Sequence, residues 1–298
     1  MSTDTDGGTE PGEGFTRLVG VGGVSLAADV GGPDNGPTVM LLHGGGQTRH
    51  SWAGTWRTLV DDGWRAVSMD LRGHGDSDWA PDGDYDIGAF TGDVVTVARG
   101  LHHPPVLVGA SLGGIASLLA VGEAADQAAL ASGLILVDIA HRMESNGRDR
   151  IGQFMTDHLD GFATLDDAAD VIAAYNPHRP RPTDLSGLAK NLRQREGRWY
   201  WHWDPRFVQG RFDFEDETRS ATLAPGRLAD AARALRIPTL LVRGRRSDLL
   251  SEEGAQEFLA LVPHAEYADV SGAGHMVAGD RNEVFNDAVF GFLHRLHP

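Results

Sequence analysis

The sequence predicts a doubly wound α/β fold, with a mostly parallel sheet and an inserted helical cap. Short, continuously apolar segments recur along the chain, and amphipathic helical segments separate them, except in one long central stretch. Such apolar runs are typical of parallel strands covered on both faces, and their alternation with helices builds a doubly wound sheet. The central strands are expected at Thr38–His43, Ala66–Asp70, Val106–Ala110, Leu134–Asp138 and Thr239–Arg243.

Two further local patterns define the layers around this sheet. Apolar residues at helical spacing predict one helix through Ile87, Phe90, Val94 and Val97, and a last helix through Val284, Ala288, Phe292 and Leu296. Near the N-terminus, Phe15–Val19 and Ser25–Asp29 flank the pair Gly22-Gly23, which indicates an antiparallel hairpin. The sheet is therefore expected to be mixed at that edge.

The interruption of the strand and helix alternation predicts the domain organisation. Residues 1–14 are expected to form a disordered acidic leader, residues 15–140 and 235–298 the α/β core, and residues 141–234 the helical cap. A separate second domain is the alternative, but the sheet needs strands from both sides of the insertion. The expected cap helices are Arg148–Leu159, Asp166–Tyr175 and Arg219–Leu235.

Composition limits the possible partners. The 298 residues are 41% apolar, and 26 basic against 42 acidic side chains give a formal charge of -16, which repels nucleic acid and anionic membranes. The chain has no cysteine, no apolar run long enough for a bilayer span and no signal-peptide pattern at its start. We expect a cytoplasmic protein that acts on a small molecule, without a cofactor or a metal; the pattern does not specify its oligomeric state.

Ser111 is the predicted nucleophile. The segment from Val106 to Gly114 reads VLVGASLGG, a buried strand followed at once by G-x-S-x-G and then by a helix of small residues. A serine on such a strand-to-helix turn has a strained backbone, and Gly109 and Gly113 remove side chains that would clash across the turn. The hydroxyl is thereby exposed at the N-terminus of a helix, whose N–H groups can stabilise an oxyanion.

A glycine-rich turn after the first central strand predicts the rest of an oxyanion hole. The donors are expected to be the backbone N–H groups of Gly45 and Leu112, and because three glycines do not fix the register, Gly46 or Gln47 is the alternative to Gly45. His43 precedes these glycines, and His74 lies in the stretch DLRGHGDS. We interpret both histidines as turn-stabilising hydrogen-bonding groups, not as bases.

The predicted base and acid lie after later strands. His275, in GAGHM, is the expected general base, and Asp248, just after Thr239–Arg243, is the expected acid that orients it. The chain order Ser, Asp, His matches that of a nucleophile elbow, since loops at the carboxyl ends of parallel strands meet at one edge of the sheet. Asp138, which ends the strand before the cap, is the alternative acid.

At these motifs the chain resembles the α/β-hydrolase superfamily, in particular its cap-bearing, cofactor-free serine hydrolases. The resemblance covers about residues 15–140 and 235–298, and its most specific parts are His43-Gly44, DLRGHGDS, GASLGG and GAGHM. It implies cleavage of an ester or lactone through an acyl-enzyme. Carbon-carbon bond hydrolases and perhydrolases of this superfamily use the same triad, and a binding protein that retained the fold is a further alternative. Ser111 argues against epoxide hydrolases and haloalkane dehalogenases, which need a carboxylate nucleophile.

Aromatic residues in the cap suggest the kind of substrate. Trp199, Trp201 and Trp203 lie in one short segment, where they either pack the cap core or line a pocket above Ser111. Trp52 and Met276 are weaker pocket candidates because they follow the oxyanion turn and the catalytic histidine in sequence. The expected substrate is small to medium in size and mainly hydrophobic.

Overall fold

An eight-stranded, mostly parallel sheet forms the centre of the computed structural model, which describes residues 14–175, 181, 183–189, 191–209, 226–270 and 283–297. The strand order is β1-β2-β4-β3-β5-β6-β9-β10; β1 and β2 pair antiparallel, β2 and β4 also pair antiparallel, and the remaining pairs are parallel. The strands are β1 (Gly14–Val19), β2 (Ser25–Gly31), β3 (Thr38–Leu42), β4 (Arg65–Met69), β5 (Val106–Ala110), β6 (Gly133–Val137), β9 (Thr239–Gly244) and β10 (Glu266–Val270). The predicted central strands and the mixed edge are confirmed.

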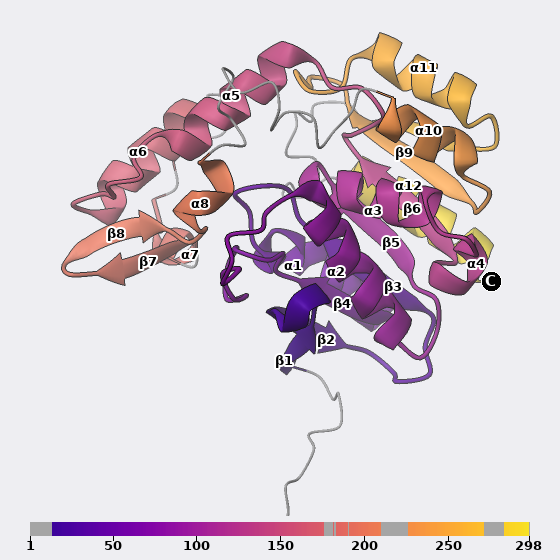
Figure 1. Cartoon of the computed structure of the whole chain (residues 1–298), viewed down its shortest axis with the longest axis horizontal. Helices are drawn as coiled ribbons and strands as arrows, with labels where there is room; N and C mark the ends of the chain where they lie inside the picture. Colours follow the sequence, from indigo (N-terminus) through magenta and orange to yellow (C-terminus); the bar gives the residue numbers. More distant parts are fainter. Residues whose placement is uncertain are drawn as a thin grey trace, which may run out of the picture.

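Helices cover both faces of the sheet (Figure 1). One hydrophobic cluster contains side chains of α1 (Ala53–Asp61) and α12 (Glu283–Leu296). The other contains side chains of α2 (Ile87–Gly100), α3 (Leu112–Gly122), α4 (Gln127–Leu130), α10 (Arg227–Ala234) and α11 (Glu252–Leu261). Two short 3-10 helices, η1 (Val21–Gly23) and η2 (Arg49–Trp52), complete the core elements.

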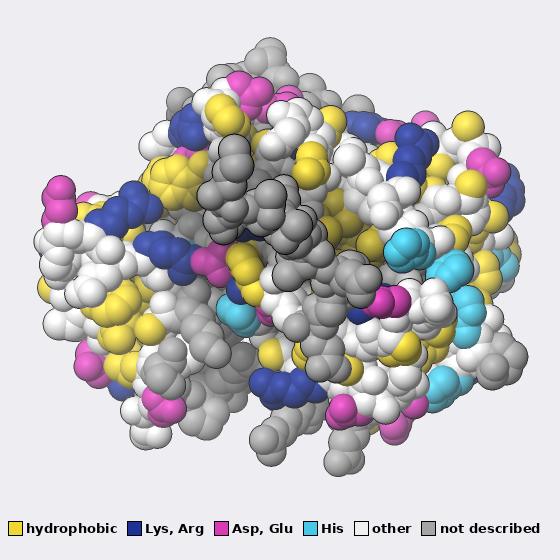
Figure 2. Space-filling model, turned by 90° about the horizontal axis from the view of Figure 1, so that it is seen from below, with side chains coloured by type: hydrophobic (Ala, Val, Ile, Leu, Met, Phe, Trp, Pro, Cys, Tyr) yellow, Lys and Arg dark blue, Asp and Glu magenta, His cyan; other side chains and the backbone are white. Residues whose placement is uncertain are grey.

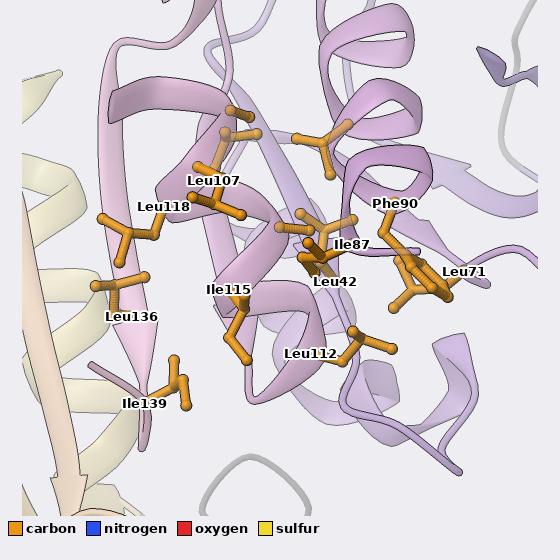
Figure 3. Packing of buried hydrophobic residues seen from close by; sticks show 14 of the residues in the cluster. Leu42, Leu71, Ile87, Phe90, Leu107, Leu112, Ile115, Leu118, Leu136 and Ile139 are labelled. Carbon is orange, nitrogen blue, oxygen red and sulfur yellow. The ribbon is translucent and has the colours of Figure 1, made fainter. Parts of the chain in front are cut away.

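Buried aliphatic side chains fix α3 against the sheet. Ile115 and Leu118 of α3 belong to the same buried cluster as Leu107 of β5 and Leu136 of β6, and all four are at most 5% exposed (Figure 3). Full burial of one such side chain stabilises the fold by about 1.5–3 kcal/mol. Because α3 directly follows Ser111, this packing holds the turn that carries the serine.

The cap contains a β-hairpin, which the expectation of a helical cap did not include. Its elements are α5 (Ser145–Thr156), α6 (Leu165–Tyr175), α7 (Ser186–Ala189), β7 (Leu192–Arg195), β8 (Arg198–Trp201) and α8 (Pro205–Val208), and Figure 1 shows them on one side of the molecule. Glu196 and Gly197, between the two strands, have φ values of 49° and 77°. Positive φ at both central residues is typical of the two-residue turns that join twisted antiparallel strands.

The last predicted cap helix belongs to the core instead. Of the expected segment Arg219–Leu235, residues 219–225 lie outside the described residues, and α10 covers Arg227–Ala234. This helix packs on α3 so closely that a Cβ added to Gly122 would lie 2.5 Å from the Ala231 carbonyl oxygen. Residues 227–234 therefore form part of the core, although they fall within the predicted cap of 141–234. The other two cap helices agree with α5 and α6 within several residues.

The surface mixes both signs of charge. On the face shown in Figure 2, acidic and basic side chains are interspersed with hydrophobic ones. Partly exposed ion pairs among the described residues include Arg193 with Asp76 at 2.6 Å and Arg227 with Glu123 at 2.6 Å. None of the helices in the described ranges has both the length and the apolar character that crossing a membrane requires.

Candidate active site

Ser111 lies on a strained turn between β5 and α3. Its backbone angles are φ 46° and ψ -113°, a region that non-glycine residues seldom occupy. The turn is tight: a Cβ on Gly109 would lie 2.5 Å from the Gly113 carbonyl oxygen, and one on Gly113 would lie 2.6 Å from the Leu42 carbonyl oxygen. Only glycine fits at either position. The strain and the glycines are those expected of a nucleophile elbow.

The glycine-rich loop after β3 closes over the same turn. The Gln47 N–H donates to the Gly44 carbonyl oxygen at 3.1 Å, and Gly46, the third residue of this turn, has a φ of 73°. The Gly113 N–H donates to the His43 carbonyl oxygen at 3.2 Å, and a Cβ on Gly44 would lie 3.2 Å from Ser111 Cβ. The predicted oxyanion loop and the predicted nucleophile are therefore neighbours.

The two predicted oxyanion donors are the backbone N–H groups of Leu112 and Gly45. Leu112 is the first residue of α3, so its N–H has no partner within the helix, and across the described part of the chain neither this N–H nor that of Gly45 donates a hydrogen bond. N–H groups that donate no hydrogen bond, at a helix N-terminus and in a glycine turn, are suited to stabilising a developing negative charge.

His43 and His74 have the structural contacts predicted for them. His43 is fully buried; its Nδ1 lies 2.8 Å from the Gly44 carbonyl oxygen, and its Nε2 accepts from the Leu71 N–H at 3.0 Å. Burial lowers the pKa of His43 to about 4, so the ring is neutral at pH 7. The buried His74 lies with its Nδ1 3.0 Å from the Arg72 carbonyl oxygen.

Asp138, the alternative acid, lies beside the elbow. It directly follows β6, has a φ of 54°, and is fully buried. Its carboxylate accepts from the Gly244 N–H at 3.0 Å and from the Ser247 hydroxyl at 2.5 Å. The preceding residue, Val137, accepts from the Ser111 N–H at 3.4 Å, so the backbones of the two candidate residues are adjacent.

Asp248, the predicted acid, contacts the cap. Its carboxylate lies 2.7 Å from Nη1 of Arg150 on α5, and its side chain is 39% exposed. The backbone is also in close contact with α5, because a Cβ on Gly147 would lie 2.5 Å from the Asp248 carbonyl oxygen. The predicted base His275 and the pocket candidate Met276 lie outside the described residues.

Apolar side chains from the cap lie over the oxyanion loop. A Cβ on Gly45 would lie 3.6 Å from Met155 Sδ and 3.8 Å from the Phe207 ring, and one on Gly46 would lie 3.5 Å from the Trp203 ring. All three side chains are at most 2% exposed. Trp203 was a predicted pocket residue; Met155 and Phe207 were missed, because no local pattern relates α5 and α8 to a loop after β3.

The other tryptophans have different surroundings. Trp201 stacks on Trp203 with ring centroids 4.7 Å apart and also contacts Phe162, so it packs the cap core. Trp199 pairs with Phe162 through backbone hydrogen bonds. Trp52 is fully buried in the cluster of α1 and α12, where its ring centroid lies 6.3 Å from that of Phe285. The structure therefore groups Trp52 with the core and not with the cap residues near Gly45.

Within the described ranges, no three histidine or acidic side chains gather in a way that would hold a metal ion. The site instead combines the hydroxyl of Ser111, the backbone N–H donors beside it and the buried carboxylate of Asp138. These are the components of nucleophilic acyl transfer, apart from the base.

Comparison with known proteins identifies the family. A model of the alpha/beta hydrolase family matches residues 39–288. An esterase of Mycobacterium tuberculosis is 29% identical over 265 residues, which cover 86% of this chain and 83% of that protein. The 3-hydroxybutyrate-oligomer hydrolase of Cupriavidus necator is 27% identical over 275 residues, covering 88% and 91%.

The solved structures agree on the fold. The crystal structure of E-2-(acetamidomethylene)succinate hydrolase aligns with a TM-score of 0.79 at 22% identity and covers 94% of this chain and 99% of that one. The family match and the two relatives support a hydrolase with esterase-type activity. The chain belongs to the α/β-hydrolase family.

Proposed function

We propose that this protein is a serine esterase that cleaves carboxylic esters or lactones of small to medium, mainly hydrophobic substrates. The observation that carries the proposal is the strained backbone of Ser111 together with the N–H groups of Gly45 and Leu112, which donate no hydrogen bond within the described residues. The apolar side chains over the loop, Met155 and Phe207, favour an uncharged substrate. The names of the two relatives, an esterase and an oligomer hydrolase, support ester chemistry.

In the proposed mechanism, the Ser111 hydroxyl attacks the substrate carbonyl while His275 accepts its proton. The oxyanion that forms accepts hydrogen bonds from the Gly45 and Leu112 N–H groups, each contributing about 3 kcal/mol to transition-state stabilisation. His275 then protonates the leaving alkoxide, which departs as the alcohol. Water, deprotonated by the same histidine, hydrolyses the acyl-enzyme and regenerates the serine.

The contacts of the two candidate acids favour Asp138 over the predicted Asp248. A triad acid must hold its histidine in one orientation and stabilise the imidazolium, and a buried, fixed carboxylate does this better than an exposed one. Asp138 is buried, and the Gly244 N–H and the Ser247 hydroxyl hold its carboxylate in place. Asp248 is directed to Arg150 and is partly exposed to water.

Covalent labelling with a fluorophosphonate and turnover of short p-nitrophenyl esters test the proposal. We expect the protein to gain the mass of one phosphonyl group at Ser111 and to hydrolyse the ester, and we expect Ser111→Ala to lose both properties. Folded protein that shows neither labelling nor turnover would support the alternative of a binding protein.

Comparing esters with lactones, vinylogous diketones and peracid formation then separates an esterase from the carbon-carbon bond hydrolases and perhydrolases. A rate for a diketone above that for every ester would contradict the proposed bond type.

We further propose that the protein acts in the cytoplasm on small molecules and does not bind nucleic acid, given its charge of -16.

A further inference from the structure

A buried histidine of the cap contacts the oxyanion loop. His202 follows β8 and is 1% exposed. Its Nδ1 accepts from the Gly75 N–H at 2.8 Å, and its Nε2 lies 3.2 Å from the Gly46 carbonyl oxygen. Because Nδ1 accepts a backbone N–H, the ring proton is on Nε2, which donates to Gly46. One imidazole thus joins two core loops to the cap.

The Gly46 carbonyl belongs to a glycine-rich turn whose backbone has few restraints of its own. Gly44, Gly45 and Gly46 are consecutive, and glycine has the greatest backbone freedom of any residue. Inside the loop, Gln47 supports the turn through its N–H to the Gly44 oxygen and through its side-chain oxygen, which accepts from the Gly44 N–H at 3.0 Å. The hydrogen bond from His202 restrains the peptide unit that follows Gly46, and it comes from a residue 156 positions away in the chain.

The surroundings of His202 keep the ring neutral and fixed. Its ring centroid lies 5.8 Å from that of His74 and 5.2 Å from that of Trp203. Burial lowers the pKa of His202 well below that of a free histidine, so it remains a single-proton donor at pH 7.

We propose that His202 is a positioning residue. Through it, the cap, when it is packed on the core, holds the oxyanion loop in its catalytic geometry. The inference rests on the proposed serine esterase function. His202 does not touch the reacting atoms; it acts through the Gly46 carbonyl on the turn that contains the Gly45 N–H. The oxyanion hole is then complete only when the cap segment around residue 202 lies on the core.

Other contacts hold this cap segment independently of His202. The Asp204 N–H donates to the Gly73 carbonyl oxygen at 2.9 Å, and the Tyr85 hydroxyl donates to the Asp204 carboxylate at 2.6 Å. Substitution of His202 therefore removes the link to Gly46 while leaving these anchors in place. Tyr85→Phe provides the matched control, because it weakens a cap anchor that does not contact the oxyanion loop.

Two conservative variants separate the two hydrogen bonds of the ring. His202→Gln can place an amide N–H near the position of Nε2 and keep the bond to Gly46, whereas His202→Asn can place an oxygen near Nδ1 and keep only the bond to Gly75. We expect His202→Asn to lower kcat for a p-nitrophenyl ester by about tenfold to a hundredfold, with KM changed less than about threefold, since a misplaced donor affects mainly the transition state. His202→Gln should recover most of kcat, and Tyr85→Phe should retain it.

Amide hydrogen exchange of the segment around residues 44–47 provides a readout that does not depend on turnover. We expect faster exchange there in His202→Asn than in the parent or in Tyr85→Phe. Equal exchange in all three proteins would overturn the positioning role, even if the parent had no esterase activity. In an active parent, equal kcat values for the Asn and Gln variants, or a rise in KM alone, would also overturn it. Absence of labelling and turnover in the parent would instead count against the proposed function.

Discussion

The Asp248 carboxylate lies 2.7 Å from the Arg150 guanidinium and so connects the loop after β9 to cap helix α5. The side chains of both residues are more than one third exposed. Exposed ion pairs contribute little to stability, because water and salt screen them. A carboxylate that is screened by water and paired with a cap guanidinium is less suited to orienting a catalytic base than the buried carboxylate of Asp138.

We therefore expect Asp248→Asn and Arg150→Met to have similar, modest effects, within about tenfold of the parent kcat. Asp138→Asn should lower kcat by orders of magnitude, because the corresponding Asp-to-Asn change in a trypsin-type triad lowers kcat by about 10⁴-fold. Single-turnover acylation rates of the parent and the three variants measure these effects. A loss confined to Asp248→Asn, with near-parental rates for Asp138→Asn, would assign the acid to Asp248.

Gly113→Ala should destabilise the fold. The added Cβ would lie 2.6 Å from the Leu42 carbonyl oxygen, which is backbone and cannot turn aside. We expect the free energy of unfolding to fall by about 2–3 kcal/mol, as for overpacking elsewhere in protein cores. Urea unfolding measures the change. The matched control is Gly88→Ala in α2, where nothing lies within 4 Å of the added atom, and its stability should stay within about 1 kcal/mol of the parent.

Stability should decrease as the pH falls from about 7 to about 5. Burial lowers the pKa values of His43 and His202 in the folded protein, while in the unfolded chain they titrate near 6.5. The unfolded state therefore binds protons first as the pH falls, so the stability that is present above pH 6.5 is lost progressively below it. For His43, a pKa of about 4 corresponds to a total loss of about 3 kcal/mol.

Urea unfolding at pH 7, 6 and 5 measures this dependence. His202→Gln replaces one titrating group by a neutral one and should reduce the slope. A slope unaffected by this change would show that His202 is not held neutral in the folded state.

Met155→Ala should change substrate preference. The side chain lies next to the positions where Gly45 and Gly46 would carry a Cβ, so its removal opens space beside the oxyanion loop. We expect kcat/KM to rise for bulkier acyl chains relative to acetyl esters. Ile151→Ala is the control, because Ile151 lies one turn earlier on α5, is partly buried, and is absent from the nearest neighbours of both glycines. Equal acyl preferences in the two variants would exclude Met155 from the pocket.

Local sequence alone determined the elements that build the core. The five-residue apolar run Val106–Ala110 has to be a covered strand, and the glycines around Ser111 permit only a tight turn after it. The hairpin at the first edge likewise follows from two glycines with positive φ, Gly22 and Gly23. These features depend on residues close together in the chain, so periodicity and turn chemistry are sufficient to predict them.

The tertiary structure decided which distant side chains meet. Sequence order favoured Asp248 and left Asp138 as the alternative, and only packing buries Asp138 and directs Asp248 to Arg150. The cap hairpin could have been recognised from the Glu196-Gly197 turn, whereas no local signal relates His202 to Gly46. The contacts of Asp248 with Arg150 and of His202 with Gly46 join segments 98 and 156 residues apart, and their partners are set by how the cap packs on the core, which local propensity does not specify.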